Sequence, residues 1–235
     1  MMAAPPIGPS PPRQPTLLKF VSRRQAAAAL VARVVADLEQ ALARRGAASL
    51  AVPGGTTPGE FLALLGYRSL DWRRVTVTLT DERWVAPSHE RSNTGLVART
   101  LGSHARPYNW FPIWRPGVPL GEAPGLLESD GASLPWPLDV VVLGMGEDGH
   151  VASLFPGDET GFAAGTLRRF VAVRGPGDEP RVSLTASAIA AARRTCLMVT
   201  GERKQAMLRD PADTTLPVAR VLAQCPGRVV AYAAD

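Results

Sequence analysis

The chain has 235 residues, of which 46% are hydrophobic, and a formal net charge of +5 at pH 7. This length suits one domain with a single sizeable core, and no apolar run approaches the roughly 20 residues that a membrane-spanning helix needs. The arginines are scattered without interleaved aromatic residues, so the charge does not indicate a nucleic-acid binder and fits a protein that handles small anions equally well. We therefore expect a cytoplasmic protein with no nucleic-acid or membrane partner.

A proline-rich segment, residues 1–16, begins the chain and shows no apolar periodicity. Such a segment cannot bury enough apolar surface to offset its chain entropy, so we expect it to be disordered. The folded domain would then comprise residues 17–235.

Helices and strands are predicted from the apolar pattern along the rest of the chain. Residues 22–45 place their apolar side chains on one helical face and end at Gly46, which predicts an amphipathic helix. The order strand, loop, helix then recurs, with strands expected at 48–52, 73–80, 137–144, 169–175, 181–185, 195–201 and 228–234, and helices at 58–67, 92–102, 185–193, 201–210 and 216–224. Residues 80–93 are expected to form a loop, and 115–137 an irregular surface segment.

Apolar strands that alternate with helices are typical of a mostly parallel sheet with helices on both faces. We therefore predict a single-domain, doubly wound α/β fold. In such sheets ligands bind at the carboxyl ends of the strands, so the loops that follow the expected strands are the candidate sites.

The first of these loops contains Gly54, Gly55 and Thr56, between an expected strand and a helix entered through Pro58. Its backbone N–H groups and the positive end of the helix dipole would point at one spot, which is where a phosphate would bind. The same residues also fit a tight turn in which Thr57 is the helix N-cap.

A second glycine loop, residues 144–149, has the G-x-G-x-x-G spacing of dinucleotide-binding loops. That interpretation requires a helix that begins at the loop, and Pro156 stops any helix within two turns. The loop instead brings Asp148 close to His150. A histidine can take a proton from water, and a nearby carboxylate can orient the imidazole and stabilise its charged form. Alternatively, Asp148 caps a helical turn and His150 packs against the sheet.

Charged residues lie at further ends of strands and helices. Asp81, Glu82 and Arg83 form a cluster after an expected strand, where Asp81 and Arg83 are candidates for substrate contact. A structural network of ion pairs explains Glu82 equally well. Arg181 opens a later strand and Lys204 lies in the first turn of a helix, and each taken singly is explained by a solvated surface charge.

The cysteines and histidines do not indicate a metal site. Cys196 and Cys225 lie in apolar segments without C-x-x-C spacing, which predicts two buried thiols. His89, His104 and His150 are widely separated and form no ligand pair at helical spacing. We therefore expect chemistry without a metal.

Taken in order, these motifs resemble those of the 6-phosphogluconolactonases, part of a larger group that includes the glucosamine-6-phosphate deaminases. The resemblance covers residues from about 17 to 235 and rests on GGTTP (54–58), TDERWV (80–85), SN (92–93), GMGEDGHVASLFP (144–156), RVSLT (181–185), G-x-x-K (201–204) and LPVAR (216–220). It implies a Rossmann-like domain that hydrolyses 6-phospho-D-glucono-1,5-lactone to 6-phospho-D-gluconate in the oxidative pentose phosphate pathway, without a cofactor.

The resemblance also implies residue roles. His150 would activate water with support from Asp148, and the sugar phosphate would be bound by Gly54, Gly55, Thr56, Arg181 and Lys204. The chain departs from the family pattern at Pro53, where a small hydroxyl residue is usual, and at Val151, where threonine is common. Because proline lacks a backbone donor, the first departure would weaken phosphate affinity.

Other functions stay open at this point. Deaminases resemble one another in placing N-E-P after the histidine, whereas this chain has SLFP at 153–156, and an apolar S-L-F cannot relay protons. This difference favours lactone hydrolysis. A non-catalytic sugar-phosphate sensor and a basic nucleic-acid binder are further alternatives, although no appended pair of DNA-binding helices supports them. We expect a monomer or small homo-oligomer whose partner is a sugar phosphate lactone.

Overall fold

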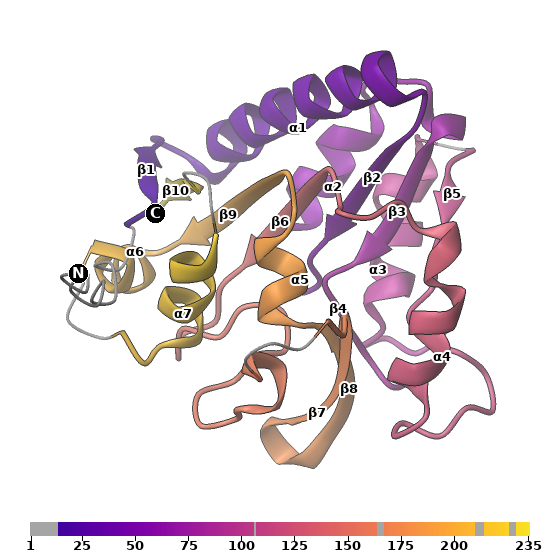
Figure 1. The fold of residues 1–235 in the computed structure, drawn as a ribbon. Helices are drawn as coiled ribbons and strands as arrows, with labels where there is room; N and C mark the ends of the chain where they lie inside the picture. Colours follow the sequence, from indigo (N-terminus) through magenta and orange to yellow (C-terminus); the bar gives the residue numbers. More distant parts are fainter. Residues whose placement is uncertain (1–13, 106, 164–166, 210–213, 226–228) are drawn as a thin grey trace, which may run out of the picture.

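The computed structural model describes residues 14–105, 107–163, 167–209, 214–225 and 229–235. Within these ranges, strands and helices alternate along the chain and form one α/β domain around a central sheet (Figure 1). The predicted fold class is thereby confirmed. Residues 1–13, the larger part of the expected disordered tail, lie outside the described ranges.

A seven-stranded sheet forms the centre, and every neighbouring pair of its strands runs parallel. Its order is β1-β10-β9-β6-β2-β3-β5. The strands are β1 (Thr16–Lys19), β2 (Ala48–Val52), β3 (Val75–Leu79), β5 (Asn109–Trp110), β6 (Val140–Gly144), β9 (Arg194–Thr200) and β10 (Val230–Ala234). Because all seven strands point the same way, their carboxyl ends meet at one edge of the sheet.

Helices cover both faces of this sheet (Figure 1). The long helix α1 (Arg23–Arg45) packs along β10, β9, β6 and β2 and contacts α2 (Gly59–Gly66), which in turn contacts α3 (Asn93–Arg99). On the opposite face, α5 (Ala186–Ala190) contacts α7 (Pro217–Gln224). The other helices are α4 (Ala123–Asp130) and α6 (Glu202–Arg209).

The ends of α1 follow from its sequence. The Ser22 hydroxyl accepts a hydrogen bond from the backbone N–H of Gln25, and Gly46 ends the helix with a φ of 76°. Glycine adopts this left-handed conformation without the steric penalty of a Cβ atom. Leu30, Val34 and Leu38 are fully buried on one face of the helix, as the apolar periodicity predicts.

A separate antiparallel sheet, with the order β4-β8-β7, corrects two of the expectations. It consists of β4 (Asp81–Arg83), β8 (Glu179–Leu184) and β7 (Phe170–Gly175), so the expected loop at 80–93 begins with a strand. The expected strands at 169–175 and 181–185 belong to this sheet and not to the parallel one. The chain changes sheets at Thr80, whose N–H donates to Val52 and whose carbonyl accepts from the N–H of Leu184.

Besides β4, three helices and strands were not predicted from the sequence. Residues 115–137 contain α4, which has a proline in its first turn and buries Ala123 and Leu127. The edge strands β1 and β5 are short, and β1 begins at Thr16, the last residue of the expected tail.

The core fills the space between the sheet and its helices, and all five residues of β2 and of β3 are buried. Cys196 and Cys225 are free, buried thiols, as predicted. Burial raises the pKa of the Cys196 thiol to about 12 and that of Cys225 to about 11. Among the described residues, no helix is long and apolar enough to cross a membrane.

Candidate functional site

A pocket of about 210 Å³ lies at the carboxyl ends of β2, β3 and β6. Its lining includes every sequence-predicted site residue except Asp148, namely Gly54, Gly55, Thr56, Asp81, Arg83, His150, Arg181 and Lys204. Asp148 is hydrogen-bonded to His150. A larger cavity of about 1210 Å³ lies over α4 and β7, and its charged lining residues are Glu122, Glu128 and Arg168. We place the candidate site in the smaller pocket because the basic side chains and the histidine meet there.

The loop after β6 holds His150 in a fixed relation to Asp148. The ring Nδ1 of His150 lies 2.6 Å from Oδ1 of Asp148, and the backbone N–H of His150 donates to the same oxygen at 3.2 Å. The loop is closed by Gly146, whose N–H donates to the His150 carbonyl at 2.9 Å. A Cβ atom on Gly146 would lie 2.2 Å from the imidazole ring. Only glycine therefore leaves room for the ring in this position.

The electrostatics of this pair favour an ionised Asp148. Burial raises the pKa of the Asp148 carboxyl, but the backbone and side-chain hydrogen bonds from His150 outweigh it, so the pKa lies below its ordinary value. A negative charge on Asp148 stabilises a protonated imidazole next to it.

The alternative interpretation of the same two residues is wrong. The ring of His150 lines the pocket with 30% of its side chain exposed, and its centroid lies 4.9 Å from that of Phe155. It is therefore not packed against the sheet. Residues 151–154 form a bridged turn and not a helical one, so Asp148 caps no helix.

The loop after β2 brings its backbone to the pocket. A Cβ atom on Gly54 would lie 1.9 Å from Oδ1 of Asn93, so this glycine allows the amide side chain to approach. Gly55 has a φ of 93°, which also favours glycine. The N-cap of α2 is Pro58, without a side-chain hydrogen bond, so the expected alternative in which Thr57 caps the helix is wrong.

Two arginines face each other across the antiparallel sheet at the pocket. Arg83 on β4 is paired directly with Arg181 on β8. Arg83 donates to Oδ1 of Asn93 at 2.7 Å, and Arg181 donates to Oε2 of Glu179 at 2.6 Å. In both arginines Nε is buried and has no hydrogen-bond partner among the described residues. Like charges directly opposite each other are destabilising, and here the carboxylates of Glu179 and Asp81, 2.6 and 3.8 Å from Arg181, offset part of the repulsion.

Lys204 adds a third positive charge. It follows β9 in the first turn of α6, and its Nζ lies 3.3 Å from Oε1 of Glu147 in the histidine loop. The side chains of Lys204 and Arg181 are only 15% and 11% exposed. Neither is the solvated surface charge that each would be if taken alone.

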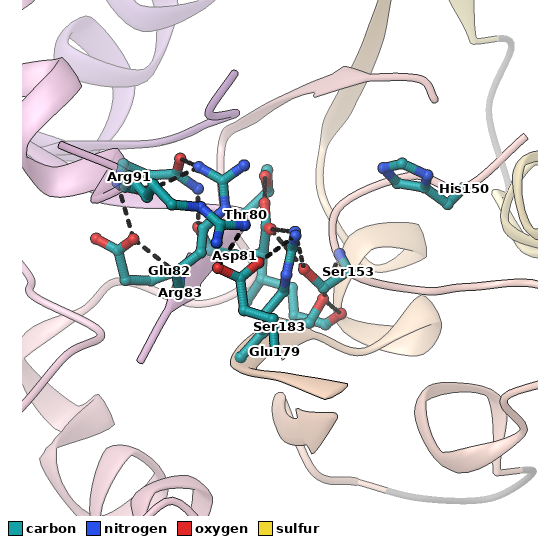
Figure 2. Close-up of polar contacts among 12 residues, drawn as sticks. Thr80, Asp81, Glu82, Arg83, Arg91, His150, Ser153, Glu179 and Ser183 are labelled. Carbon is teal, nitrogen blue, oxygen red and sulfur yellow. Dashed lines mark hydrogen bonds and ion pairs between the residues drawn. The ribbon is translucent and has the colours of Figure 1, made fainter. Parts of the chain in front are cut away.

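The acidic residues after β3 have different surroundings (Figure 2). Asp81 faces the pocket, and its Oδ2 accepts a 2.6 Å hydrogen bond from the Ser153 hydroxyl. Glu82 is fully buried and accepts the backbone N–H groups of Asn93 and Thr94, both at 2.8 Å, at the start of α3. Burial raises the pKa of Glu82, although these hydrogen bonds oppose the shift. Glu82 thus has a structural role, but the expected network of ion pairs is wrong, because among the described residues its partners are backbone N–H groups and a hydroxyl.

Sequence reasoning missed the parts played by Asn93 and Ser153. The Asn93 side chain lines the pocket, accepts from Arg83 and donates to the Asp81 carbonyl at 2.8 Å. Ser153 links Asp81 to the segment after His150. Asn93 lies within the motif SN and Ser153 within ASLFP, so the family motifs could have indicated both residues. Their hydrogen-bond partners, however, depend on the tertiary structure.

Comparisons with known proteins show the family of the chain. The family described as glucosamine-6-phosphate isomerases/6-phosphogluconolactonase matches residues 21–231. The chain is 43% identical over 192 residues to a protein of Mesorhizobium japonicum named 6-phosphogluconolactonase, which covers 79% of this chain and 80% of the relative. A protein of the same name from Caulobacter vibrioides is 39% identical over 213 residues, or 87% of this chain and 91% of the relative.

Solved structures give the same result. The crystal structure of a 6-phosphogluconolactonase from Shewanella baltica superposes with a TM-score of 0.89 at 31% identity, covering 96% of this chain and all of that one. A structure from Neisseria gonorrhoeae, described as a putative 6-phosphogluconolactonase, superposes with a TM-score of 0.83, also at 31% identity, over 94% of this chain and 99% of that one.

Proposed function

Because the chain belongs to the family of glucosamine-6-phosphate isomerases and 6-phosphogluconolactonases, we propose that its pocket hydrolyses 6-phospho-D-glucono-1,5-lactone to 6-phospho-D-gluconate. This is a step of the oxidative pentose phosphate pathway. The observation that carries the proposal is the meeting, in one pocket, of a carboxylate-oriented imidazole and three cations.

The cations would bind the phosphate end of the substrate. Arg83, Arg181 and Lys204 line the pocket together with the backbone of residues 54–56, and Asp81 is the one carboxylate among the described lining residues. Guanidinium groups form charge-assisted hydrogen bonds with phosphate oxygens, and both arginines line the pocket. Holding the phosphate fixes the sugar ring, so that the lactone carbonyl carbon lies near His150.

His150 would then act as the general base. With its Nδ1–H donated to Asp148, the neutral imidazole presents an unprotonated Nε2. This nitrogen takes a proton from water as the oxygen attacks the lactone carbonyl carbon, and Asp148 stabilises the imidazolium. The tetrahedral intermediate collapses with cleavage of the bond to the ring oxygen, which receives the proton from His150.

Backbone N–H groups of the histidine loop would stabilise the negative oxygen of the intermediate. The N–H groups of Gly146 and Gly149 already donate within the loop, to the carbonyls of His150 and Gly146. The oxyanion donors are therefore sought among the other amides of residues 144–149.

Lactone hydrolysis is favoured over deamination by the segment after the histidine. Ser153 and Leu154 are buried, and the Ser153 hydroxyl is bound to Asp81. Neither provides a carboxylate that could assist the opening of an amino sugar ring. Action in the cytoplasm, a monomeric or small homo-oligomeric state and the absence of a nucleic-acid partner stay predictions.

The test is a lactonase assay on His150→Ala, with the lactone generated in situ by glucose-6-phosphate dehydrogenase and acid release measured above the spontaneous rate. We expect kcat to fall about 10²-fold or more with KM largely kept, because the base is lost and the phosphate contacts remain. His104→Ala is the matched control, since His104 stacks on Tyr67 and does not line the pocket. Unchanged turnover in His150→Ala, or ammonia release from glucosamine-6-phosphate by the wild type, would contradict the proposal.

A further inference from the structure

A second charged cavity lies at the opposite edge of the central sheet. It has a volume of about 390 Å³, and its charged lining residues are Arg44, Arg45, Arg193, Arg194, Asp37 and Asp139. Asp139 immediately precedes β6, and Arg194 is the first residue of β9. The cavity therefore lies where these strands begin, whereas the proposed catalytic pocket lies where they end.

The two carboxylates of this cavity already have partners. Oδ2 of Asp139 accepts the backbone N–H of Ser49 at 2.9 Å, and its Oδ1 contacts Arg45 and, at 3.3 Å, Nε of Arg193. Asp37 accepts two hydrogen bonds from Arg33, at 2.7 and 2.8 Å. The aspartates are thus neutralised, and the cavity keeps a surplus of positive charge.

Two observations locate this surplus. Arg44 makes no ion pair with any residue in the described part of the chain. Nε of Arg194 is buried without a hydrogen bond to a described residue, although Oδ2 of Asp37 lies 3.3 Å away. Asp37 thus serves both Arg33 and Arg194, so its single negative charge cannot balance both guanidinium groups.

The helix dipole explains only part of this cluster. Arg44 and Arg45 lie in the last turn of α1, where cations are favoured by the partial negative charge of the helix end. Arg193 and Arg194 come instead from the connection between α5 and β9. Two segments that are far apart in the sequence therefore bring guanidinium groups to the same cavity.

We propose that this cavity binds the oligophosphate chain of a small anion. Guanidinium groups bind phosphate oxygens in pairs of parallel hydrogen bonds, and several linked phosphates offer oxygens to several arginines at once. A single carboxylate or phosphate would reach fewer of them. A free oligophosphate and a nucleoside triphosphate share this chemistry, and the site is independent of the lactonase reaction.

The test is calorimetric titration of the full chain with sodium tripolyphosphate and, separately, ATP, at an ionic strength of roughly 0.15 M. Excess 6-phosphogluconate fills the proposed catalytic pocket throughout. Arg44→Glu removes the arginine that has no described ion pair, so it leaves no carboxylate unpaired. Arg68→Glu makes the same change of charge at an exposed residue outside the cavity and serves as the matched control.

We expect Arg44→Glu to weaken tripolyphosphate binding about tenfold or more, and Arg68→Glu to change it by less than about twofold. Equal affinity for tripolyphosphate and ATP would identify the phosphate chain alone as the ligand, and tighter binding of ATP a nucleotide. Absence of saturable binding in the wild type, or equal loss in the two variants, would overturn the proposal. If Arg44→Glu melts early, Arg193→Gln decides in its place, because Asp139 keeps Arg45 and Ser49.

Discussion

At the scale of single residues, the proposed chemistry depends on the hydrogen bond between the His150 ring and the Asp148 carboxylate. Their 2.6 Å contact joins a carboxylate to a ring nitrogen at a site where both side chains are partly exposed. Gly146 is the residue that makes this possible, since any side chain there would displace the imidazole. The geometry of the base thus depends on a position that contributes no side chain.

Removal of the ring should change the titration of Asp148. Although burial raises the pKa of Asp148, hydrogen bonds from His150 lower it by more, so the pKa of this carboxyl in the folded protein lies below its ordinary value. Ionised Asp148 therefore stabilises the fold at pH values above the ordinary carboxyl pKa of about 3.9. This contribution to stability is lost as the pH falls through the lowered pKa that Asp148 has in the folded protein. In His150→Ala the backbone N–H still donates to Asp148 but the hydrogen bond and charge of the ring are lost, so we expect the Asp148 pKa, measured by carbon NMR of the carboxyl group, to rise part of the way toward the ordinary value. A pKa that stays unchanged would show that the ring does not act on the carboxylate.

Lys204 should affect binding more than turnover. In Lys204→Ala we expect a higher KM for the lactone with kcat largely kept, because a charge-assisted contact to the phosphate is lost far from the reacting carbon. Arg203→Ala is the control, since Arg203 is the exposed neighbour on the same helix and does not line the pocket. A change confined to kcat would contradict the placement of the phosphate.

At the scale of elements, β4 and α3 are held together by one buried side chain. Glu82 accepts two backbone N–H groups at the start of α3, and the same turn places Asn93 against Arg83. A strand, a helix and a cation of the pocket therefore share one carboxylate.

Loss of this carboxylate should affect both stability and binding. We expect Glu82→Ala to lower the free energy of unfolding by about 1–3 kcal/mol in urea titrations, because buried N–H groups lose their acceptor. KM should rise as Asn93 and Arg83 shift. Since the pKa of Glu82 is raised in the folded protein, its stabilising contribution is present below the unfolded pKa and declines as the pH rises through the folded value. The neutral isostere Glu82→Gln should lack this pH dependence.

Some elements could be predicted from the sequence because their signals are local. The periodicity of α1 lies within the helix and its caps directly flank it, and the largely buried strands β2, β3 and β6 are short runs rich in apolar residues. The pairing of β8 with β4 could not be predicted in this way, because an apolar strand does not reveal its partner. The prolines and glycines around α4 indicated an irregular segment, whereas a helix forms there and buries Ala123 and Leu127.

The candidate site was predictable to a similar extent. His150, Arg181 and Lys204 follow or open strands and helices, so the topology of a parallel sheet and the family motifs both indicate them. Asn93 and Ser153 act through hydrogen bonds to residues 10 and 72 positions away. No sequence pattern specifies such distances.

At the scale of the whole molecule, much of the core lies away from the pocket. Leu30 lies on the buried face of α1, is fully buried and does not line the pocket. We expect Leu30→Ala to lower the free energy of unfolding by about 2–5 kcal/mol, measured by thermal melting and urea titration, with KM unchanged below the transition. Val21→Ala is the control, because Val21 is 91% exposed. A large change in KM in Leu30→Ala would show that the core also sets the pocket geometry.

The facing pair Arg83 and Arg181 has a consequence for throughput. If these arginines hold the phosphate, they grip a group that ring opening leaves chemically unaltered, so they favour the departing acid as much as the incoming lactone. Such affinity lowers KM without accelerating the bond-breaking step. Accumulated 6-phosphogluconate would then compete with the lactone for the pocket. The rate of turnover would therefore depend on how quickly a later reaction consumes the 6-phosphogluconate.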